Sequence, residues 1–378
     1  MENLVLYRKY RPKAFAEMVG QEHVIRTLTN ALTLGKVAHA YLFCGPRGTG
    51  KTTIARILAK AINCETRAKD PKSGAEPCNK CSACQEINEG RALDLIEIDA
   101  ASNRGIDEIR ELREGIKFAP NRLKYKVFII DEVHMLTREA FNALLKTLEE
   151  PPAHCIFVLA TTELHKVPPT IVSRCQHFDF HKLTLEKIIQ RLKFVAKKEG
   201  VKIDDRALEL IAANAEGGAR DAESLLGQVF AMQDKDVTLE EVQGILGTTD
   251  IAAVSQMSEF LIKKDAREAI VFVNKIAQDG YDLAQFTKSL INYLRQMMIL
   301  SVYKEFANDD KSRKQMRELF APELTEEQFK VILEQGQKLP TTEIIGAIKL
   351  FVRAENEVKS AVLPQLPLEM AVVELMEQ

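Results

Sequence analysis

Eight consecutive residues near the start of the chain have the types and the order that bind a phosphate chain. They are Gly45-Pro46-Arg47-Gly48-Thr49-Gly50-Lys51-Thr52, a full match to the pattern GxxxxGK[ST]. Glycines let the backbone wrap around phosphates, so that N–H groups and a helix N-terminus face the negative charge. Lys51 is predicted to reach the β- and γ-phosphates, and the hydroxyl of Thr52 to bind Mg²⁺. The loop therefore predicts binding of a nucleoside triphosphate.

An acidic pair supplies the second part of this chemistry. Asp131 and Glu132 follow the apolar run Val127-Phe128-Ile129-Ile130, which is typical of a central strand covered on both faces. Downstream of a phosphate loop, such a pair is the Walker B arrangement. Asp131 would hold Mg²⁺ through water, and Glu132 would polarise the water that attacks the γ-phosphate. A solvated acid pair at a strand end is common, but the loop upstream favours the catalytic interpretation.

Four of the seven cysteines form a cluster with metal-binding spacing. They are Cys64, Cys78, Cys81 and Cys84, in the pattern C-x13-C-x2-C-x2-C. Four thiolates suit tetrahedral Zn²⁺, although iron–sulfur clusters also use runs of C-x2-C-x2-C, and spacing alone leaves both open. We expect a structural zinc module at about 64–84, inserted between the phosphate-loop helix and the next strand. Loss of its metal is expected to loosen this loop and to change nucleotide affinity little.

The elements that must position these groups alternate between strands and helices up to about residue 180. Helical spacing follows the phosphate loop and recurs over Arg138–Glu150, where Pro151-Pro152 gives a strong stop signal. This alternation predicts a parallel α/β sheet with flanking helices for residues 1–180. The apolar strand candidates are Ala40–Cys44, Leu93–Asp99, Lys126–Asp131 and Cys155–Thr161.

Beyond residue 180 the strand signals disappear and helical patterns replace them. Residues 181–243 contain three helix candidates, with Thr184 placed as the N-cap of the first. Residues 244–378 are again helical in pattern. We therefore expect a small helical lid domain over 181–243 and an all-α domain over 244–378.

The composition limits the classes of protein that fit. The chain has 378 residues and a formal net charge of −2, so no global field would draw it to nucleic acid, and any DNA contact must come from a local surface. No apolar run approaches the roughly 20 residues that span a bilayer, and the N-terminus lacks the flanks of a signal peptide. We expect a cytoplasmic protein with no membrane partner.

Further segments complete a pattern that covers essentially the whole chain. They include Tyr7-Arg8-Lys9-Tyr10-Arg11-Pro12, Val19-Gly20-Gln21-Glu22-His23, Ala143–Pro152 and Ser173-Arg174-Cys175. With the phosphate loop, the acidic pair and the cysteines, the chain resembles the gamma/tau family of bacterial DNA polymerase III, the clamp-loader ATPases of the AAA+ superfamily. The resemblance implies an α/β P-loop AAA+ domain with the inserted zinc module, then the lid, then a helical collar that holds a ring of five subunits.

The resemblance also implies roles that spacing alone does not give. Arg174 would act in trans, as an arginine finger on ATP bound by the neighbouring subunit. Thr162 and Arg220 would be the sensor 1 and sensor 2 residues, although a threonine after a strand or a lone arginine is ordinarily structural or solvated. The residues implied near the adenine base are Tyr7, Arg8, Arg11, Pro12 and Val19, beside the phosphate-binding residues Gly45, Pro46, Arg47, Gly48, Thr49, Gly50, Lys51, Thr52 and Thr53.

The implied function is an ATP-driven switch that opens the beta sliding clamp and loads it onto primer–template DNA during replication. Its cofactors would be ATP, Mg²⁺ and Zn²⁺. Its partners would be the delta and delta-prime subunits, further copies of itself, the clamp, the DNA and accessory subunits linked to single-strand-binding protein, in a nucleoid-associated replisome. One departure from the family is visible. Late in the helix that carries Arg220, this chain has Gly227-Gln228 where the family usually has Asp-Gln. Because the pattern ends at Gln378 after the collar, we expect a gamma-like form or a shortened tau.

Three other classes of function compete with this interpretation. A ring helicase or another AAA+ remodeller is disfavoured by the collar-like third region and the cysteine cluster. A non-hydrolysing subunit like delta-prime is disfavoured by the intact Lys51, Thr52, Asp131 and Glu132. A zinc-dependent nucleic-acid module is the weakest alternative, because the cluster has no interleaved basic and aromatic residues.

Overall fold

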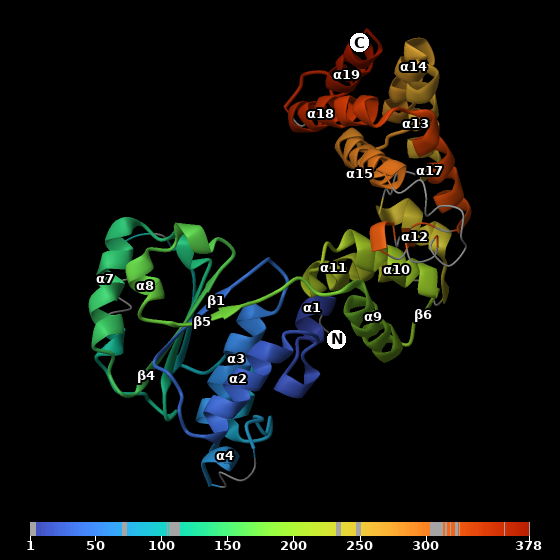
Figure 1. The fold of residues 1–378 in the computed structure, drawn as a ribbon. Helices are drawn as coiled ribbons and strands as arrows, with labels where there is room; N and C mark the ends of the chain where they lie inside the picture. Colours follow the sequence, from blue (N-terminus) through green and yellow to red (C-terminus); the bar gives the residue numbers. More distant parts are fainter. Residues whose placement is uncertain are drawn as a thin grey trace. The chain divides into compact units, whose positions relative to one another are not determined.

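The chain folds into two compact units, Met1–Asp236 and Val237–Gln378, in the computed structural model (Figure 1). The structure describes residues 5–69, 74–103, 105, 114–231, 236–246, 251–302, 313, 316–317, 319–321, 324, 326–358 and 360–377.

A five-stranded parallel sheet forms the centre of the first unit. Its strands follow the order β2-β3-β4-β1-β5, and the register pairs Phe43 with Ala160 and Ile130 with Leu159. The carboxyl ends of β1, β3 and β4 therefore meet at one edge, where the phosphate loop, the acidic pair and Thr162 follow them. The strands are β1 (Ala40–Cys44), β2 (Leu95–Asp99), β3 (Lys126–Asp131), β4 (Cys155–Thr161) and β5 (Gln176–Asp179).

Helices cover both faces of this sheet, because successive side chains of a strand point to opposite sides. Helices α2 (Glu22–Thr33) and α3 (Lys51–Asn63) pack on the face that carries Phe43 (Figure 1). Helices α7 (Arg138–Glu149) and α8 (Pro169–Val172) pack on the face that carries Leu42. The predicted parallel α/β sheet with flanking helices is confirmed, and β3 and β4 lie in its interior as expected.

Strand β5 was not predicted. Of its four residues only Phe178 is buried, and the other three are exposed at the edge of the sheet. An edge strand of this kind needs no apolar run, so the signal for a buried strand is missing. Strand β2 begins at Leu95 and not at Leu93. The carboxylate of Asp94 instead accepts hydrogen bonds from the backbone N–H groups of residues 121–123 at 2.8–2.9 Å.

Short elements complete the sheet region. Between α3 and β2 lie α4 (Glu65–Lys69) and α5 (Ser82–Glu89). Of the clustered cysteines, Cys64 is the C-cap of α3, Cys81 the N-cap of α5, and Cys84 lies within α5. The chain before α2 forms α1 (Leu6–Lys9) and the 3-10 helix η1 (Phe15–Glu17). Two further 3-10 turns follow sheet strands, η3 (Val133–Met135) after β3 and η4 (Leu164–Lys166) after β4.

Three helices follow the sheet within the first unit. They are α9 (Leu185–Glu199), α10 (Asp205–Asn214) and α11 (Ala219–Phe230), with the short strand β6 (Lys202–Ile203) after α9. Thr184 caps α9 as predicted, because its hydroxyl accepts a hydrogen bond from the Lys187 N–H at 3.4 Å. Helix α1 packs against α11, which brings the N-terminal segment to this helical region.

The second unit is helical, as the sequence predicts. Its long helix α15 packs against its neighbours around a core that includes Phe286, Leu290 and Phe351, all fully buried. No helix in the described part of the chain is long and apolar enough to cross a membrane. The elements from the unit boundary onward are β7 (Asp236–Val237), α12 (Leu239–Leu246), α13 (Ile251–Lys263), α14 (Ala266–Gln278), α15 (Leu283–Val302), α17 (Glu326–Lys338), α18 (Thr341–Val358) and α19 (Leu366–Met376).

Candidate nucleotide-binding site

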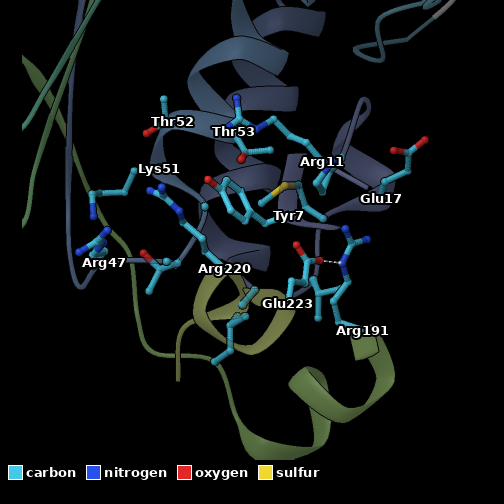
Figure 2. A pocket seen from close by; sticks show the side chains of 18 of the residues that line it. Tyr7, Arg11, Glu17, Arg47, Lys51, Thr52, Thr53, Arg191, Arg220 and Glu223 are labelled. Carbon is cyan, nitrogen blue, oxygen red and sulfur yellow. Dashed lines mark hydrogen bonds and ion pairs between the residues drawn. The ribbon is translucent and has the colours of Figure 1, made fainter. Parts of the chain in front are cut away.

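A pocket in the first unit brings together the phosphate loop, the acidic pair and the N-terminal segment. Figure 2 shows side chains of the loop, among them Lys51 and Thr52, together with Tyr7 and Arg11 of the N-terminal segment. Residues far apart in the sequence, from α1 to α11, form its walls. Its lining residues are Tyr7, Arg11, Pro12, Glu17, Met18, Val19, Arg47, Gly48, Thr49, Gly50, Lys51, Thr52, Thr53, Asp131, Glu132, Leu183, Arg191, Ala219, Arg220 and Glu223.

The phosphate loop has the backbone that its glycines permit. Gly45, Gly48 and Gly50 have φ angles of 143°, 76° and 102°, in the region that side chains disfavour. A Cβ on Gly45 would lie 2.2 Å from the carbonyl oxygen of Phe180, so only glycine fits beside this segment. Gly50 is the N-cap of α3, and the helix therefore begins at Lys51 with its first N–H groups facing the loop.

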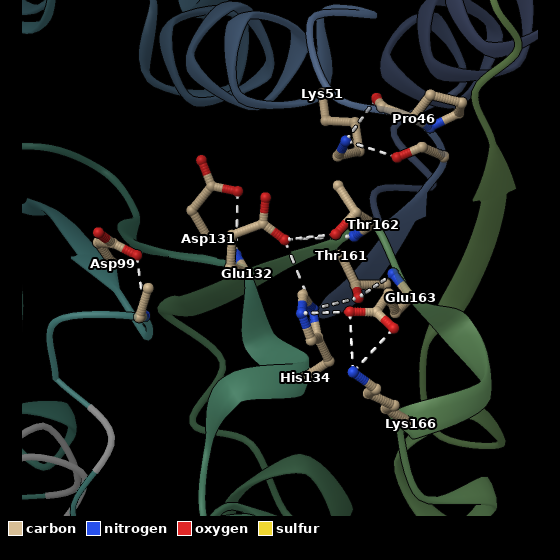
Figure 3. A network of polar contacts seen from close by, with 12 residues as sticks. Pro46, Lys51, Asp99, Asp131, Glu132, His134, Thr161, Thr162, Glu163 and Lys166 are labelled. Carbon is tan, nitrogen blue, oxygen red and sulfur yellow. Dashed lines mark hydrogen bonds and ion pairs between the residues drawn. The ribbon is translucent and has the colours of Figure 1, made fainter. Parts of the chain in front are cut away.

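The ammonium group of Lys51 is buried and turns back onto the loop. Its Nζ donates hydrogen bonds to the carbonyl oxygens of Gly45 and Pro46 at 2.7 and 2.8 Å (Figure 3). Burial lowers the pKa of Lys51, while Glu132 and Asp131 oppose this shift. A buried cation that donates its hydrogen bonds to neutral carbonyls is well placed to exchange them for a phosphate anion.

The two predicted magnesium ligands are in contact. The hydroxyl of Thr52 donates to Oδ2 of Asp131 at 2.7 Å, which joins the start of α3 to the end of β3. Hydroxyl and carboxylate oxygens are the donors that Mg²⁺ prefers, and Mg²⁺ usually keeps several waters and adds substrate phosphates. The pair therefore fits an ion that would arrive with a nucleotide.

Glu132 is held in a conformation that is uncommon for a residue with a side chain. Its φ and ψ are 48° and 45°, in the left-handed region. Its Oε2 accepts hydrogen bonds from the hydroxyl of Thr162 at 2.9 Å and from the Thr162 N–H at 3.3 Å (Figure 3). The structure thus joins the predicted catalytic acid to the predicted sensor 1 residue, which does not itself line the pocket.

His134 was missed by the sequence reasoning. Its side chain is only 5% exposed, and its Nδ1 lies 2.9 Å from the Thr161 hydroxyl and 3.4 Å from the Glu132 carboxylate. Its Nε2 lies 3.3 Å from the carboxylate of Glu163 (Figure 3). His134 lies two residues after Glu132, on the turn η3 that follows β3. This short distance from the acidic pair is the signal that could have identified it.

The N-terminal side of the pocket contains one stacked cation, Arg220, and one half-buried cation, Arg11. The guanidinium of Arg220 lies 4.7 Å from the ring centre of Tyr7, and its hydrogen bond lowers the pKa of Tyr7 (Figure 2). Arg11 lines the pocket beside them, and burial lowers its pKa. Arg8 is exposed outside the lining, with its guanidinium 5.9 Å from the centre of the Tyr7 ring.

Arg191 and Glu223 form a buried ion pair that the sequence did not reveal. Their side chains are 8% and 6% exposed, and Arg191 Nε lies 2.6 Å from Glu223 Oε1 (Figure 2). Burial raises the pKa of Glu223, and Arg191 opposes this shift. Arg191 also donates to the carbonyl oxygen of Tyr10, which ties α9 to the N-terminal segment. Charged residues on helices are normally solvated, so the local sequence around Arg191 and Glu223 gives no sign that their side chains are buried.

Arg174 lies outside the pocket. Its Nε donates to Glu149 Oε1 at 3.1 Å, and another guanidinium nitrogen donates to the Thr170 carbonyl oxygen at 2.7 Å. The side chain is 31% exposed. This placement leaves Arg174 without a part in its own pocket, and its action on a neighbouring subunit stays a prediction. The other predicted residues outside the lining are Arg8, Gly45, Pro46 and Thr162.

The four cysteines of the cluster come together although 20 positions separate the first from the last. Their sulfur atoms all lie within 4.8 Å of one another. The Lys80 and Cys81 N–H groups donate to the Cys78 sulfur at 3.4 and 3.3 Å. Burial alone would raise the pKa of Cys78, but hydrogen bonds from the Thr66 side chain and from these amides lower it to about 6. The thiolate is the form of cysteine that binds metals, so a lowered pKa favours Cys78 as a metal ligand.

Family models match three consecutive parts of the chain. Residues 20–184 match the model described as "DNA polymerase III, delta subunit". Residues 187–235 match "DNA polymerase III clamp loader subunit, ATPase lid domain", and residues 237–378 match "DNA polymerase III subunits gamma and tau domain III".

Curated relatives extend these matches across most of the chain. The DNA polymerase III subunit gamma of Buchnera aphidicola (subspecies Schizaphis graminum) is 41% identical over 82% of this chain and 84% of its own length. The chain belongs to the DNA polymerase III gamma/tau family. The tau subunit of Bacillus subtilis is 43% identical over 99% of this chain, and that of Escherichia coli is 42% identical over 84%.

Membership of the gamma/tau family confirms the resemblance that the motifs indicated. The chain spans 63% of the Bacillus subtilis tau subunit and 48% of the Escherichia coli one.

Proposed function

We propose that the chain is an ATP-hydrolysing subunit of a bacterial sliding-clamp loader. ATP binding orders a ring of subunits that opens the beta clamp, and primer–template DNA then triggers hydrolysis and release. The observation that best supports this proposal is that all the residues expected for ATP hydrolysis within one subunit lie together at one edge of the sheet. Lys51 lies in the loop, Thr52 contacts Asp131, and Glu132 contacts Thr162. A subunit that only bound nucleotide would not need the contact between Glu132 and Thr162.

Each residue of this set has a separate task in phosphoryl transfer. Lys51 exchanges its loop carbonyls for the β- and γ-phosphate oxygens, and Thr52 and Asp131 hold Mg²⁺, which neutralises charge on the phosphates. Glu132 orients and polarises the attacking water. Because Thr162 donates to the same Glu132 oxygen, it fixes the direction of that carboxylate and serves as sensor 1.

The N-terminal side would bind the adenine base, and its Arg220 would respond to the presence of the γ-phosphate. Tyr7, Arg11, Pro12 and Val19 line that side, where a purine can pack against the aromatic ring. Arg220, stacked on Tyr7, would turn to the γ-phosphate as sensor 2, and so link the nucleotide to the position of α11.

We further propose that the cysteine cluster holds Zn²⁺. Bonds of about 2.3 Å from zinc to sulfur place tetrahedral thiolates about 3.8 Å apart. The Cys78 and Cys84 sulfur atoms lie 4.0 Å apart, and all four lie within 4.8 Å. An iron–sulfur cluster places several iron and sulfide atoms between its thiolates and needs a wider separation. This spacing favours one zinc ion.

The assembly follows from the same family. We propose an AAA+ domain at 1–180, a lid at 181–243 and a collar at 244–378 that joins further copies of the chain to delta and delta-prime subunits. Arg174 would complete the site of the neighbouring subunit. The complex would work in the cytoplasm at the replisome.

The ATPase rate tests the proposal directly. The purified chain is measured alone and with partner subunits, clamp and primed DNA, beside a Lys51→Ala variant as the inactive control. We expect the complete mixture to raise the rate well above that of the chain alone. A rate indifferent to partners, clamp and DNA would contradict the clamp-loader assignment, and a parent rate equal to that of Lys51→Ala would contradict ATP hydrolysis itself.

A further inference from the structure

The chain between residues 11 and 19, here called the pocket segment, lines the nucleotide pocket only at its two ends. Arg11 and Pro12 line it at the start, and Glu17, Met18 and Val19 line it at the end. The middle of the segment instead contacts the cysteine module, defined as residues 64–90. Glu76 of the module makes a direct contact, and Lys60 of α3 bridges the segment to the module.

Glu76 of the cysteine module holds the middle of the pocket segment. Its Oε2 accepts a hydrogen bond from the Phe15 N–H and its Oε1 one from the Ala16 N–H, both at 2.9 Å. These amides start the 3-10 helix η1, whose N-cap residue Ala14 has only a methyl group to offer. The carboxylate therefore satisfies two N–H groups that the segment cannot satisfy itself, with charge-assisted bonds.

Lys60 connects three parts of the molecule at one buried ammonium group. It lies on α3, the phosphate-loop helix, and is 2% exposed. Its Nζ donates to the Lys13 carbonyl oxygen at 2.6 Å and to the Asn79 and Asn88 side-chain oxygens, each at 2.7 Å. Three acceptors use all three ammonium hydrogens. The pocket segment, α3 and the cysteine module are thus joined by one side chain.

The metal ligands lie next to these contacts. Asn79 lies in the turn between Cys78 and Cys81 and has a left-handed φ of 55°. Ligation of both cysteines would fix this turn, and with it the oxygen that Lys60 uses. Ala75, beside Glu76, is buried in the same core cluster as Phe15 of the pocket segment. A loosened module would therefore release Glu76, Asn79 and the support of η1 together.

We propose that the cysteine module, acting through Glu76 and Lys60, positions the pocket segment for nucleotide binding, so that metal loading and nucleotide affinity are linked. This rests on the proposed function of the pocket. The sequence alone favours the opposite, a module whose metal has little influence on nucleotide affinity. Linkage is reciprocal, so bound nucleotide must raise the metal affinity by the factor by which metal raises nucleotide affinity.

Nucleotide titration of the full chain tests the link. The dissociation constant of a fluorescent ATP analogue is measured for the parent, for Glu76→Ala and for Glu89→Ala, and the zinc content of each is determined. Glu89 is a matched control, because it lies in the same module and pairs with the exposed Arg91. We expect Glu76→Ala to weaken binding at least about fivefold with zinc retained, and Glu89→Ala to change neither quantity.

Chelation provides the second arm of the experiment. Removing zinc from the parent should weaken analogue binding by at least a similar factor, whereas removing it from Glu76→Ala should weaken binding less, because only the connection through Lys60 is then left to lose. Glu76→Gln, which keeps the side-chain shape and one acceptor oxygen, should fall between parent and Glu76→Ala. It also replaces Glu76→Ala if circular dichroism shows that variant to be unfolded.

The outcomes separate the two proposals. A parent chain that binds no nucleotide would contradict the proposed function. A parent that binds, beside folded Glu76 variants and a chelated form that bind equally well, would overturn the positioning role of the module while leaving the proposed function intact. Unchanged zinc retention in the presence of saturating nucleotide would also overturn it, because the link must act in both directions.

Discussion

The phosphate side of the pocket is built from two short motifs, whereas the N-terminal side is held by contacts between residues far apart in the sequence. On the phosphate side, Lys51 bonds within its own loop, and Thr52 meets Asp131 because parallel strands end at one edge. On the N-terminal side, Arg191 reaches Tyr10 across 181 positions and Glu76 reaches Phe15 across 61.

This difference separates chemistry from positioning. A glycine loop or an acidic pair carries its geometry in its own backbone, so its spacing predicts what it does. The N-terminal side owes its shape to the Arg191–Glu223 pair and to contacts with the cysteine module. Their charged residues resemble ordinary solvated side chains when each is considered alone. Substitutions of the acidic pair should therefore change turnover, Lys51 should affect both binding and turnover, and substitutions on the N-terminal side should change affinity and stability.

The largest effect is expected for Arg174, which belongs to neither side of its own pocket. Arg174→Ala should lower DNA-stimulated hydrolysis by the assembled loader roughly 10³- to 10⁵-fold, as for other arginine fingers. The isolated chain should bind ATP normally, because the residue does not line its pocket. Mixed complexes with Lys51→Ala subunits should keep activity only where one shared site stays intact. Weakened ATP binding by the isolated Arg174→Ala chain would place the residue in its own site.

Glu132 tests the phosphate side most directly. Glu132→Gln should keep ATP bound and lower turnover by roughly 10²- to 10⁴-fold, because the amide cannot polarise the attacking water. Thr162→Val, which removes only the hydroxyl that directs Glu132, should lower turnover less. Single-turnover hydrolysis beside analogue binding measures both quantities. Normal turnover by Glu132→Gln would show that another group activates the water.

The buried pair Arg191–Glu223 tests the N-terminal side through stability. Glu223→Ala leaves Arg191 without its buried partner, and breaking such a pair costs roughly 3–5 kcal/mol of unfolding free energy. Replacing both residues by methionine should recover much of this loss, because no charge is then left buried. Urea unfolding followed by circular dichroism compares the three chains. Equal losses in the single and double variants would show that the pair contributes by packing and not by charge.

Lys51 separates binding from turnover within the phosphate loop. Lys51→Ala should weaken ATP binding roughly 10- to 150-fold, the range for one lost hydrogen bond to a charged group. Lys36→Ala, at an exposed lysine outside the pocket, is the matched control and should bind normally. Tight binding by Lys51→Ala would mean that the lysine keeps its loop carbonyls when nucleotide is bound.

Predictability from sequence follows the same division. Strands β1, β3 and β4 are buried on both faces and could be predicted because their sequences are continuously apolar. Strand β5 could not, because an edge strand with one buried residue, Phe178, resembles a loop. The sharp turn at Glu132 also escapes prediction, since a positive φ at a glutamate is imposed by the surrounding fold.

Long-range polar contacts leave still less trace in the sequence. Glu76 resembles a solvated acid beside a cysteine, and Lys60 resembles an ordinary lysine late in a helix. Only the fold shows that Lys60 is buried with three acceptors. The resemblance to a family supplied Arg220 and Tyr7, but it also placed Arg8 at the base, whereas the structure puts Arg8 outside the lining.

The smallest expected effect compares Arg8 with Arg11, two neighbours of the same motif. Arg8 is exposed and contributes at most a weak cation–π contact with Tyr7 at 5.9 Å, so Arg8→Ala should change ATP-analogue affinity less than about threefold. Arg11 lines the pocket and is partly desolvated, so Arg11→Ala should cost roughly tenfold. Titration of both variants at one salt concentration makes the comparison, since screening changes exposed charges most. Equal losses of affinity would mean that Arg8 moves into the pocket when nucleotide binds. The N-terminal side would then take its final form only on nucleotide binding.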